Sequence, residues 1–357
     1  MKLLIFEFAT AVGVEDPSIT TEGRAMLSGL LSDFEDIVAD TKDYSVDYLI
    51  SENLKIKNNG QGRPVNIQED LENWLSKNIQ KYDACLLIAP EEDLILYNLT
   101  KTIEDKGVKV IGSSSEAVMM CTDKSKMYNV LKDNKSISRY LIPTEKVFFE
   151  DINNYGEKYW TISNSKKVKG IKKVVKPADG VSCAGVRVVG SLTQFKKASL
   201  DIKPLTKLPY FLIQDYIEGV TSSVSLLVNG KTALPLSLNF QNVDLKDGKI
   251  DYNGGYVPLE HELSKRAKEV AKEAVESIDG LKGYVGVDMI LGDDVNIVEI
   301  NSRLTTPYVA LRNILNFNLG KAIVDSVNEK LPSEVFINGK VEFKKEFNNL
   351  NIIKVVK

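Results

Sequence analysis

Three polar side chains alternate along one short segment near the C-terminal end of the chain, VEINSRL, residues 298–304. Glu299, Asn301 and Arg303 occupy every second position, and such residues share one face when the backbone is extended. A carboxylate, an amide and a guanidinium on one face could bind a divalent cation together with a phosphate group. The alternative is an ordinary solvated strand face, because short patterns of this kind also arise by chance.

A second carboxylate joins this set if the segment pairs with the strand that precedes it. The run GYVGVDMI, residues 283–290, has the pattern of a strand, and a short polar connection follows it. A two-residue loop at Asp293 and Asp294 would place Asp288 directly opposite Glu299. Like charges in that position repel, so a shared proton, a cation or solvent must offset them. Mg²⁺ is suited to so few protein ligands, because it keeps positions for waters and phosphates.

The composition is that of an ordinary globular protein. The chain has 357 residues, enough for two or three packed units, with 43% hydrophobic and 27% charged residues. A net charge of -3 gives no reason to expect nucleic acid or an acidic membrane surface as a partner. No apolar stretch approaches the roughly 20 residues of a membrane helix. Glu7 interrupts the apolar N-terminal segment, so we expect a cytoplasmic protein without a cleavable signal. A homo-oligomer is left open.

The cysteines and the single histidine limit the chemistry that the chain can perform. Cys85, Cys121 and Cys183 are widely spaced and odd in number, which argues against a disulfide framework or a zinc cluster. His261 lies at the start of an amphipathic pattern, where a surface or capping role is favoured. Catalysis that depends on histidine is therefore not expected.

The rhythm of apolar runs divides the chain into three regions. Over residues 1–115 short apolar runs alternate with helical segments, which predicts a parallel sheet with crossover helices. Neither a G-x-G-x-x-G nor a G-x-x-x-x-G-K-[ST] loop is present, so the usual nucleotide loops are absent. Strands dominate afterwards, and we divide this part into residues 116–210 and residues 211–357.

A glycine-containing loop lies within KPADGVSCAGVRVV, residues 176–189. Lys176 ends one predicted strand, and Gly180 and Gly185 lie in the loop before the next. Such a loop can fold over a triphosphate and donate backbone N–H groups to its oxygens. An ordinary hairpin turn is the alternative. Lys176 favours phosphate, because it places a positive charge at the base of the loop.

Taken together, these motifs resemble the ATP-grasp superfamily of carboxylate-amine ligases. The resemblance covers residues 115–320, and the preceding region looks like the superfamily's usual N-terminal domain. It implies an α/β protein with the ATP-grasp fold, in which an N-terminal parallel-sheet domain precedes two α+β lobes that enclose ATP. The small lobe would be residues 116–210, and the large lobe, with the metal site, residues 211–357. It also implies that ATP phosphorylates a carboxylate and that an amine then attacks the acyl phosphate.

The resemblance further implies a set of site residues. Those implied for ATP are Lys124, Lys176, Gly180, Gly185, Gln214, Asp215, Ile217 and Glu218. Those implied for Mg²⁺ or Mn²⁺, with two ions expected, are Asp288, Glu299 and Asn301. Arg303 and Lys176 are the implied catalytic residues, and Arg303 would steady the phosphate and the acyl intermediate. The sequence departs from the pattern at Thr221, where many relatives have the acid that binds ribose, so Glu218 is the substitute.

Within the superfamily the whole chain looks like the archaeal tyramine-L-glutamate ligases of methanofuran biosynthesis. The segments that carry this likeness are LIFEFATAVG, TEGRAML and NSRLTTPYVALRN. It implies coupling of the γ-carboxyl of L-glutamate to tyramine, with release of ADP and phosphate. Ligases of the pyrrolysine pathway and D-alanine-D-alanine ligases share the ATP site and are alternatives, as is a non-catalytic nucleotide-binding protein. Candidates for binding the acid substrate are Arg303, Arg312, Gly254 and Gly255, and a surface helix position is the alternative for Arg312.

Overall fold

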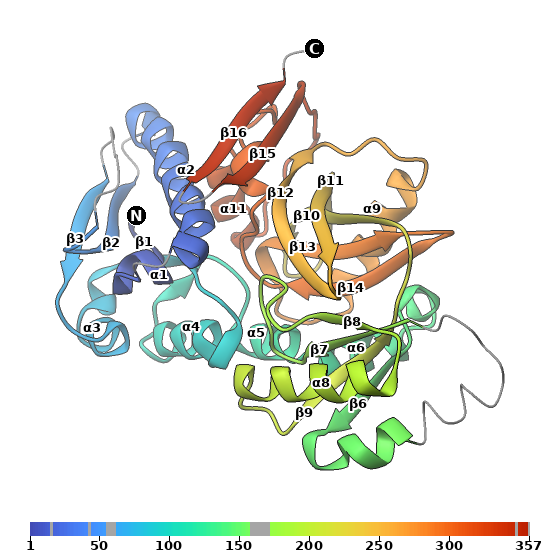
Figure 1. The fold of residues 1–357 in the computed structure, drawn as a ribbon. Helices are drawn as coiled ribbons and strands as arrows, with labels where there is room; N and C mark the ends of the chain where they lie inside the picture. Colours follow the sequence, from blue (N-terminus) through green and yellow to red (C-terminus); the bar gives the residue numbers. More distant parts are fainter. Residues whose placement is uncertain (15–16, 42–43, 55–61, 158–171, 347–348, 356–357) are drawn as a thin grey trace.

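The N-terminal region folds into a parallel sheet with crossover helices, as predicted (Figure 1). The computed structural model describes residues 1–14, 17–41, 44–54, 62–157, 172–346 and 349–355. In spatial order the strands are β3 (Arg63–Ile67), β2 (Ser45–Ser51), β1 (Lys2–Glu7), β4 (Ala84–Ile88) and β5 (Lys109–Val110). The helices of this region are α1 (Phe8–Val12), α2 (Pro17–Thr41), α3 (Leu71–Asn78) and α4 (Ile95–Asp105).

Two carboxylates lie at or just beyond the C-terminal ends of the central strands of this sheet. β1 and β4 are continuous apolar runs because helices cover both faces of a parallel sheet. Glu7 ends β1 and caps α1, since its carboxylate accepts hydrogen bonds from Ala9 N at 3.0 Å and Thr10 N at 2.8 Å. Glu91 follows shortly after β4. In parallel sheets the carboxyl ends of the strands are where ligands bind.

The small lobe is an antiparallel sheet with one long helix packed against it. In spatial order its strands are β8 (Arg187–Val189), β7 (Lys173–Pro177), β9 (Tyr210–Asp215) and β6 (Thr144–Phe148). Helix α8 (Leu192–Ile202) buries Phe195 in a core with Val175 and Phe211. The glycine loop connects β7 to β8, so the sheet fixes both of its ends.

The large lobe is a longer antiparallel sheet. In spatial order its strands are β14 (Val295–Asn301), β13 (Lys282–Leu291), β10 (Val220–Asn229), β11 (Ala233–Lys246), β12 (Lys249–Val257), β15 (Lys340–Glu346) and β16 (Asn349–Val355). Helix α9 (Ser264–Glu276) packs across this sheet (Figure 1) through small apolar residues such as Ala267 and Ala271, which allow a close approach.

Two helices lie between the lobes, and the lobes also touch through their sheets. Helices α5 (Ser115–Thr122) and α6 (Lys124–Asp133) pack on each other and on β14. The strands of the two lobes form one continuous sheet, which is joined where Arg187 of β8 pairs with Lys249 of β12. Within the described residues, no helix combines the length and apolar content needed to cross a membrane.

The N-terminal domain and the large lobe share one hydrophobic core. That core joins Leu27 and Phe34 of α2 to Tyr308 of α10 (Tyr308–Leu311), Ile323 of α11 (Leu319–Val327) and Phe343 of β15. Helix α2 consequently lies beside the C-terminal hairpin of β15 and β16 (Figure 1). Residues far apart in the sequence therefore meet at this junction.

Candidate active site

The hairpin of β13 and β14 brings the two predicted metal acids together. Asp288 pairs directly with Glu299, as the sequence predicts. The loop prediction was wrong, because three residues, 292–294, connect the strands and Leu291 pairs with Val295. That register alone would place Val298 opposite Asp288. A β-bulge between Asp288 and Met289 corrects it, since one extra residue on β14 restores the alignment of the acids.

The two carboxylates are in different electrostatic environments. Burial, and then the charge of Glu299, raises the pKa of Asp288. Burial acts in the same direction on Glu299, but attraction to Lys124 and Lys176 outweighs it and lowers the pKa of Glu299. Asp288 also accepts hydrogen bonds from Asn301 Nδ2 at 3.1 Å and from Gln241 Nε2 at 2.9 Å. The acids thus form one strongly interacting pair.

This donor set fits a hard divalent cation. Asp288, Glu299 and Asn301 come together on one side of the hairpin, and Asn301 uses its NH₂ group on Asp288, which leaves its carbonyl oxygen available. Within the described residues no cluster of three or more acids, histidines or cysteines is arranged to bind a metal. Two acids and one amide suit Mg²⁺, which completes its coordination with water and phosphate oxygens. A cation there would also relieve the repulsion between the acids.

Lys124 is positioned beside Glu299 by helix α6. Met127, one turn further along the same helix face, accepts a hydrogen bond from Ile300 N at 3.2 Å and so attaches the helix to β14. The Lys124 ammonium lies 3.3 Å from the Glu299 carboxylate and donates to the carbonyl of Gly180 at 2.6 Å. Lys124 therefore connects the metal acids to the glycine loop.

Asp123 fixes the start of helix α6, a role that the sequence analysis missed. Its carboxylate caps the helix by accepting from Ser125 N at 2.9 Å, and it accepts from the Tyr210 hydroxyl of β9 at 2.6 Å. Burial acts to raise the pKa of Asp123, but the hydrogen bonds from Tyr210 and Ser125 outweigh it and lower that pKa. An aspartate directly before the helix was the available signal, because aspartate is a preferred N-cap.

Lys176 lies at the end of β7 with only 4% of its surface exposed. Within the described part of the chain, its ammonium has no hydrogen-bond or ion-pair partner. Burial lowers the pKa of Lys176 to about 8, although Glu299 attracts the charged form. A buried positive charge without a partner is costly unless an anion joins it. The side chain is therefore suited to a phosphate group.

The glycine loop has a backbone that only a few residue types adopt easily. Gly185 has φ +74°, and the preceding Ser182 and Cys183 have φ +50° and +61°. A Cβ atom on Gly185 would lie 2.9 Å from Leu205 and 3.0 Å from Pro177, so a side chain there would be crowded as well as strained. Loop conformations of this kind expose backbone N–H groups that can bind anions.

The predicted adenine segment begins in strand β9. The amide of Gln214 donates to the Thr144 hydroxyl of β6 at 2.7 Å, and Asp215 forms an ion pair with Lys173 of β7. These contacts hold the strand firmly between its neighbours.

Ile217 and Glu218 lie in the short link between β9 and β10. Ile217 is partly buried and Glu218 is exposed. The hydroxyl of Thr221 donates to the carbonyl of Gln241 at 2.7 Å, which occupies Thr221 within the sheet. Glu218 is therefore an exposed carboxylate at this edge, whereas the Thr221 hydroxyl is already used.

Arg303 pairs with Glu91 of the N-terminal domain, a partner that the sequence analysis missed. Its Nε lies 2.9 Å from both oxygens of Glu91, and a terminal nitrogen lies 2.7 Å from one of them. A third nitrogen donates to the carbonyl of Leu304 at 3.1 Å. These bonds use three of the five guanidinium N–H groups within the described structure, which leaves two for a ligand.

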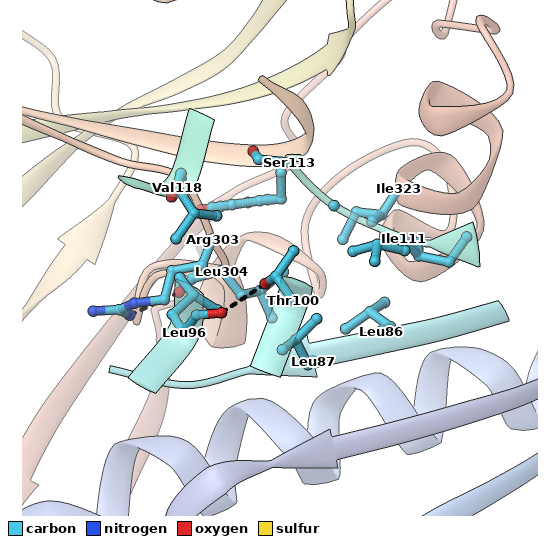
Figure 2. A pocket seen from close by; sticks show the side chains of 14 residues that line it. Leu86, Leu87, Leu96, Thr100, Ile111, Ser113, Val118, Arg303, Leu304 and Ile323 are labelled. Carbon is cyan, nitrogen blue, oxygen red and sulfur yellow. Dashed lines mark hydrogen bonds between the residues drawn. The ribbon is translucent and has the colours of Figure 1, made fainter. Parts of the chain in front are cut away.

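A small cavity of about 20 Å³ lies beside the stem of Arg303, and it has room for about one water molecule. Figure 2 shows the guanidinium pointing away from the apolar side chains that line it, such as Leu96 and Ile111. The Ser302 hydroxyl also lines this cavity and has no hydrogen-bond partner among the described residues. The cavity is too small for a substrate.

Arg312 and the glycine pair have structural explanations. Arg312 forms an ion pair with Asp33 of α2 at 2.7 Å, and its side chain is only 16% exposed, so the surface interpretation is wrong. A Cβ atom on Gly254 would lie 2.2 Å from the carbonyl of Phe343. One on Gly255 would lie 2.0 Å from another carbonyl oxygen, so both glycines allow strands to pack closely.

Comparison with known proteins agrees with this geometry. The profile of the ATP-grasp domain family matches residues 121–307, and that of the pre-ATP-grasp domain matches residues 55–118. The chain therefore belongs to the ATP-grasp family. One relative, the tyramine--L-glutamate ligase of Methanocaldococcus fervens, is 37% identical over 87% of this chain and 89% of that protein. Another, the tyramine--L-glutamate ligase of Methanocaldococcus jannaschii, is 35% identical over 92% of this chain and 90% of that protein. The prediction of an ATP-grasp ligase is confirmed.

Solved structures confirm the predicted fold. An ATP-grasp superfamily protein from Archaeoglobus fulgidus superposes with a TM-score of 0.69 over 99% of both chains at 24% identity. A biotin carboxylase from Campylobacter jejuni gives a TM-score of 0.71 over 96% of this chain and 75% of that chain at 16% identity. An L-amino acid ligase from Bacillus licheniformis gives a TM-score of 0.66 over 96% of this chain and 81% of that chain, at 12% identity.

Proposed function

We propose that the chain is an ATP-dependent ligase that joins the γ-carboxyl of L-glutamate to the amine of tyramine and releases ADP and phosphate. The observation that carries the ligase chemistry is the opposed pair Asp288 and Glu299 beside the buried ammonium of Lys176, which has no partner among the residues that the structure describes. The choice of L-glutamate and tyramine is supported by the similarity to the two Methanocaldococcus enzymes over most of the chain.

The phosphate end of ATP is assigned to the space between the lobes. Lys124 and Lys176 bind the phosphate oxygens, and the glycine loop, with Gly180 and Gly185, covers them with backbone N–H groups. Asp288 and Glu299, together with the Asn301 carbonyl, hold Mg²⁺ or Mn²⁺, and we propose two ions. When bound, the ions supply positive charge that offsets the charge of the transferring phosphoryl group.

The base of ATP is assigned to the link between the lobes. Gln214 and Asp215 end the strand that borders it, Ile217 contacts the adenine face, and Glu218 accepts hydrogen bonds from the ribose hydroxyls. The contacts of Thr221 within the sheet support Glu218 in that role.

The chemical steps need no protein nucleophile. The carboxylate of the acid substrate attacks the terminal phosphorus, ADP leaves, and an acyl phosphate forms. The neutral amine then attacks the acyl carbon, inorganic phosphate leaves, and the amine loses a proton. Arg303 uses its two remaining N–H groups to orient the carboxylate, and Arg303 and Lys176 stabilise the negative charge of the acyl phosphate. Glu91 fixes the plane of the Arg303 guanidinium.

Mass spectrometry of the reaction products tests this proposal. The protein is incubated with ATP, Mg²⁺, L-glutamate and tyramine, and in parallel with D-alanine or ornithine in place of tyramine. We expect γ-glutamyltyramine, ADP and phosphate in equal amounts, and almost none of them from the Glu299→Gln variant. Ligation of D-alanine or ornithine without γ-glutamyltyramine would contradict the substrates. ADP formation that ignores every acid and amine would contradict the ligase.

A further inference from the structure

A second charged cluster lies where helix α2 meets the C-terminal strands. Glu22 of α2 accepts a hydrogen bond from the Thr306 hydroxyl and forms an ion pair with Lys345 of β15, at 3.0 Å. The Glu22 and Lys345 side chains are 16% and 23% exposed. The pair is thus mostly shielded from solvent, although part of each side chain remains exposed. None of the roles proposed above uses these three residues.

This cluster borders the space that holds the metal acids. Thr306 lies three residues after Arg303, in the segment that directly follows strand β14 and its metal ligands. The side chain of Tyr252 of β12 is in hydrogen-bond contact with Thr306, and burial, followed by the charges of Glu22 and Asp288, raises its pKa. Tyr252 therefore connects strand β12 to this cluster through Thr306.

The glycine loop faces the same space from the other side. Burial raises the pKa of Cys183 to about 12, and the charges of Glu299, Asp288 and Glu22 act in the same direction. The sheet connects the two places, because Gln241 of β11 donates to Asp288 at 2.9 Å and pairs with Gly255 of β12, and Gly255 pairs with Phe343 of β15.

From this arrangement we infer that Glu22 and Lys345 form the receptor for the zwitterionic end of an α-amino acid substrate. Glu22 binds the α-ammonium group, and Lys345 binds the α-carboxylate. A carboxylate and an ammonium held side by side are complementary to the two charges on one α-carbon. The inference rests on the proposed function, because it requires an amino acid as the carboxylate substrate.

The receptor explains why a side-chain carboxyl reacts rather than the α-carboxyl. When the α-carbon is held between Glu22 and Lys345, the side chain extends toward Arg303 and the metal acids. The α-carboxylate is then paired with Lys345 and is kept away from the γ-phosphate. The length of the side chain, which must span the two places, selects among amino acids.

Another ion pair on helix α2 provides a matched comparison. Asp33 pairs with Arg312, and it also accepts hydrogen bonds from the Tyr308 hydroxyl and from Gly320 N at 3.0 Å. Its side chain is 5% exposed, and one of its partners, Tyr308, belongs to the shared core. This pair joins the domains as a structural contact. The Glu22 pair joins the same helix to the same C-terminal region but is more accessible.

Substrate analogues that each lack one charge test the receptor. Glutarate lacks the α-ammonium of L-glutamate, and 4-aminobutanoate lacks its α-carboxylate. We expect the unmodified enzyme to prefer L-glutamate in kcat/KM over both analogues by about 10- to 100-fold, which is the range for one lost charge-assisted hydrogen bond. Glu22→Gln should remove the preference over glutarate, mainly by raising KM for L-glutamate. Lys345→Gln should remove the preference over 4-aminobutanoate.

The control and the alternative outcomes separate the two proposals. Asp33→Asn should lower thermal stability and leave both preferences unchanged. Preferences that stay intact in folded Glu22→Gln and Lys345→Gln proteins would overturn the receptor while leaving the ligase standing. If the enzyme uses another amino acid, L-glutamate is wrong, and the same variants are tested with that amino acid and its deaminated analogue. If no amino acid is activated, both proposals fall.

Discussion

Replacing Lys176 with methionine removes a buried positive charge that has no partner within the described structure. We expect the ATP-free Lys176→Met protein to be more stable than the unmodified protein, and to bind ATP far more weakly. The two effects have opposite signs because the charge is costly when it is buried alone and favourable when a phosphate joins it. A structural role for Lys176 would instead make both effects unfavourable.

The size of the stability effect follows from the pKa. Burial lowers the pKa of Lys176 from 10.5 to about 8, even though Glu299 and Asp288 attract the charged form. Since each pKa unit corresponds to about 1.4 kcal/mol, keeping this lysine charged at pH 7 costs about 3 kcal/mol. Methionine is similar in length and carries no charge. We therefore expect Lys176→Met to raise the free energy of unfolding by about 1–3 kcal/mol.

The pH dependence provides an independent check on the cause. The folded protein loses the Lys176 proton near pH 8, whereas the unfolded chain keeps it until about pH 10.5. Because the unfolded state binds more protons in that interval, Lys176 makes the unmodified protein gain stability as the pH rises from 8 to 10.5. The advantage of Lys176→Met should therefore be complete at pH 7 and fade toward pH 10.

Chemical denaturation with and without ATP and Mg²⁺ measures both effects. Saturating ATP should stabilise the unmodified protein by about 3 kcal/mol at 100 times its Kd, and it should hardly affect Lys176→Met. Lys246→Met, at an exposed position on β11, controls for the loss of a lysine. A Lys176→Met protein that is less stable without ATP, or that ATP stabilises as usual, would refute the assignment of this lysine to phosphate.

Three further predictions follow from contacts at the site. Lys124→Met should destabilise the ATP-free protein by about 1–3 kcal/mol in denaturation experiments, because Glu299 loses its ion pair; a gain in stability would contradict this. Glu91→Gln should lower kcat more than it raises KM for ATP in initial-rate kinetics, because Arg303 loses the anion that orients it; a change confined to KM would count against that role. Deleting Val298 should leave Asp288 opposite Glu299 and Mg²⁺-dependent turnover largely intact, because the residues on either side of the bulge keep their partners; loss of turnover with unchanged circular dichroism would show that the bulge itself aims the carboxylate.

In the hairpin of β13 and β14, the sequence predicted the pairing of the acids correctly but not the path of the backbone. The alternation of Glu299, Asn301 and Arg303 predicted one polar face, and the pairing of Asp288 with Glu299 was correct. The loop, however, is one residue longer than predicted, and the bulge compensates for it. Val298 is an ordinary residue for a strand, so nothing in the sequence marks the bulge. A pairing can be inferred from chemistry even when the local path of the backbone cannot.

The two phosphate lysines show why burial and pairing had to come from the structure. The sequence treats Lys124 and Lys176 alike, since each was matched to a family motif. In the folded protein Lys124 already has Glu299 and Gly180 as partners, whereas Lys176 has none within the described residues. That difference depends on how α6 packs against β14, which no local pattern encodes. It is also why removing the two lysines should change stability in opposite directions.

Helix α2 carried a signal for the missed contacts, and that signal lay in its glycines. A glycine inside a helix costs about 1 kcal/mol relative to alanine, so its presence indicates that something packs closely there. A Cβ atom on Gly23 would lie 2.3 Å from the Glu7 side chain, and one on Gly29 would lie 3.1 Å from that of Arg312. These glycines neighbour the polar residues Glu22 and Asp33, which are 11 residues apart and therefore point in nearly the same direction. If α2 were interpreted only as an amphipathic helix, both acids would be assigned to its solvent-exposed face. The glycines indicate instead that this face of α2 packs closely against other chain segments.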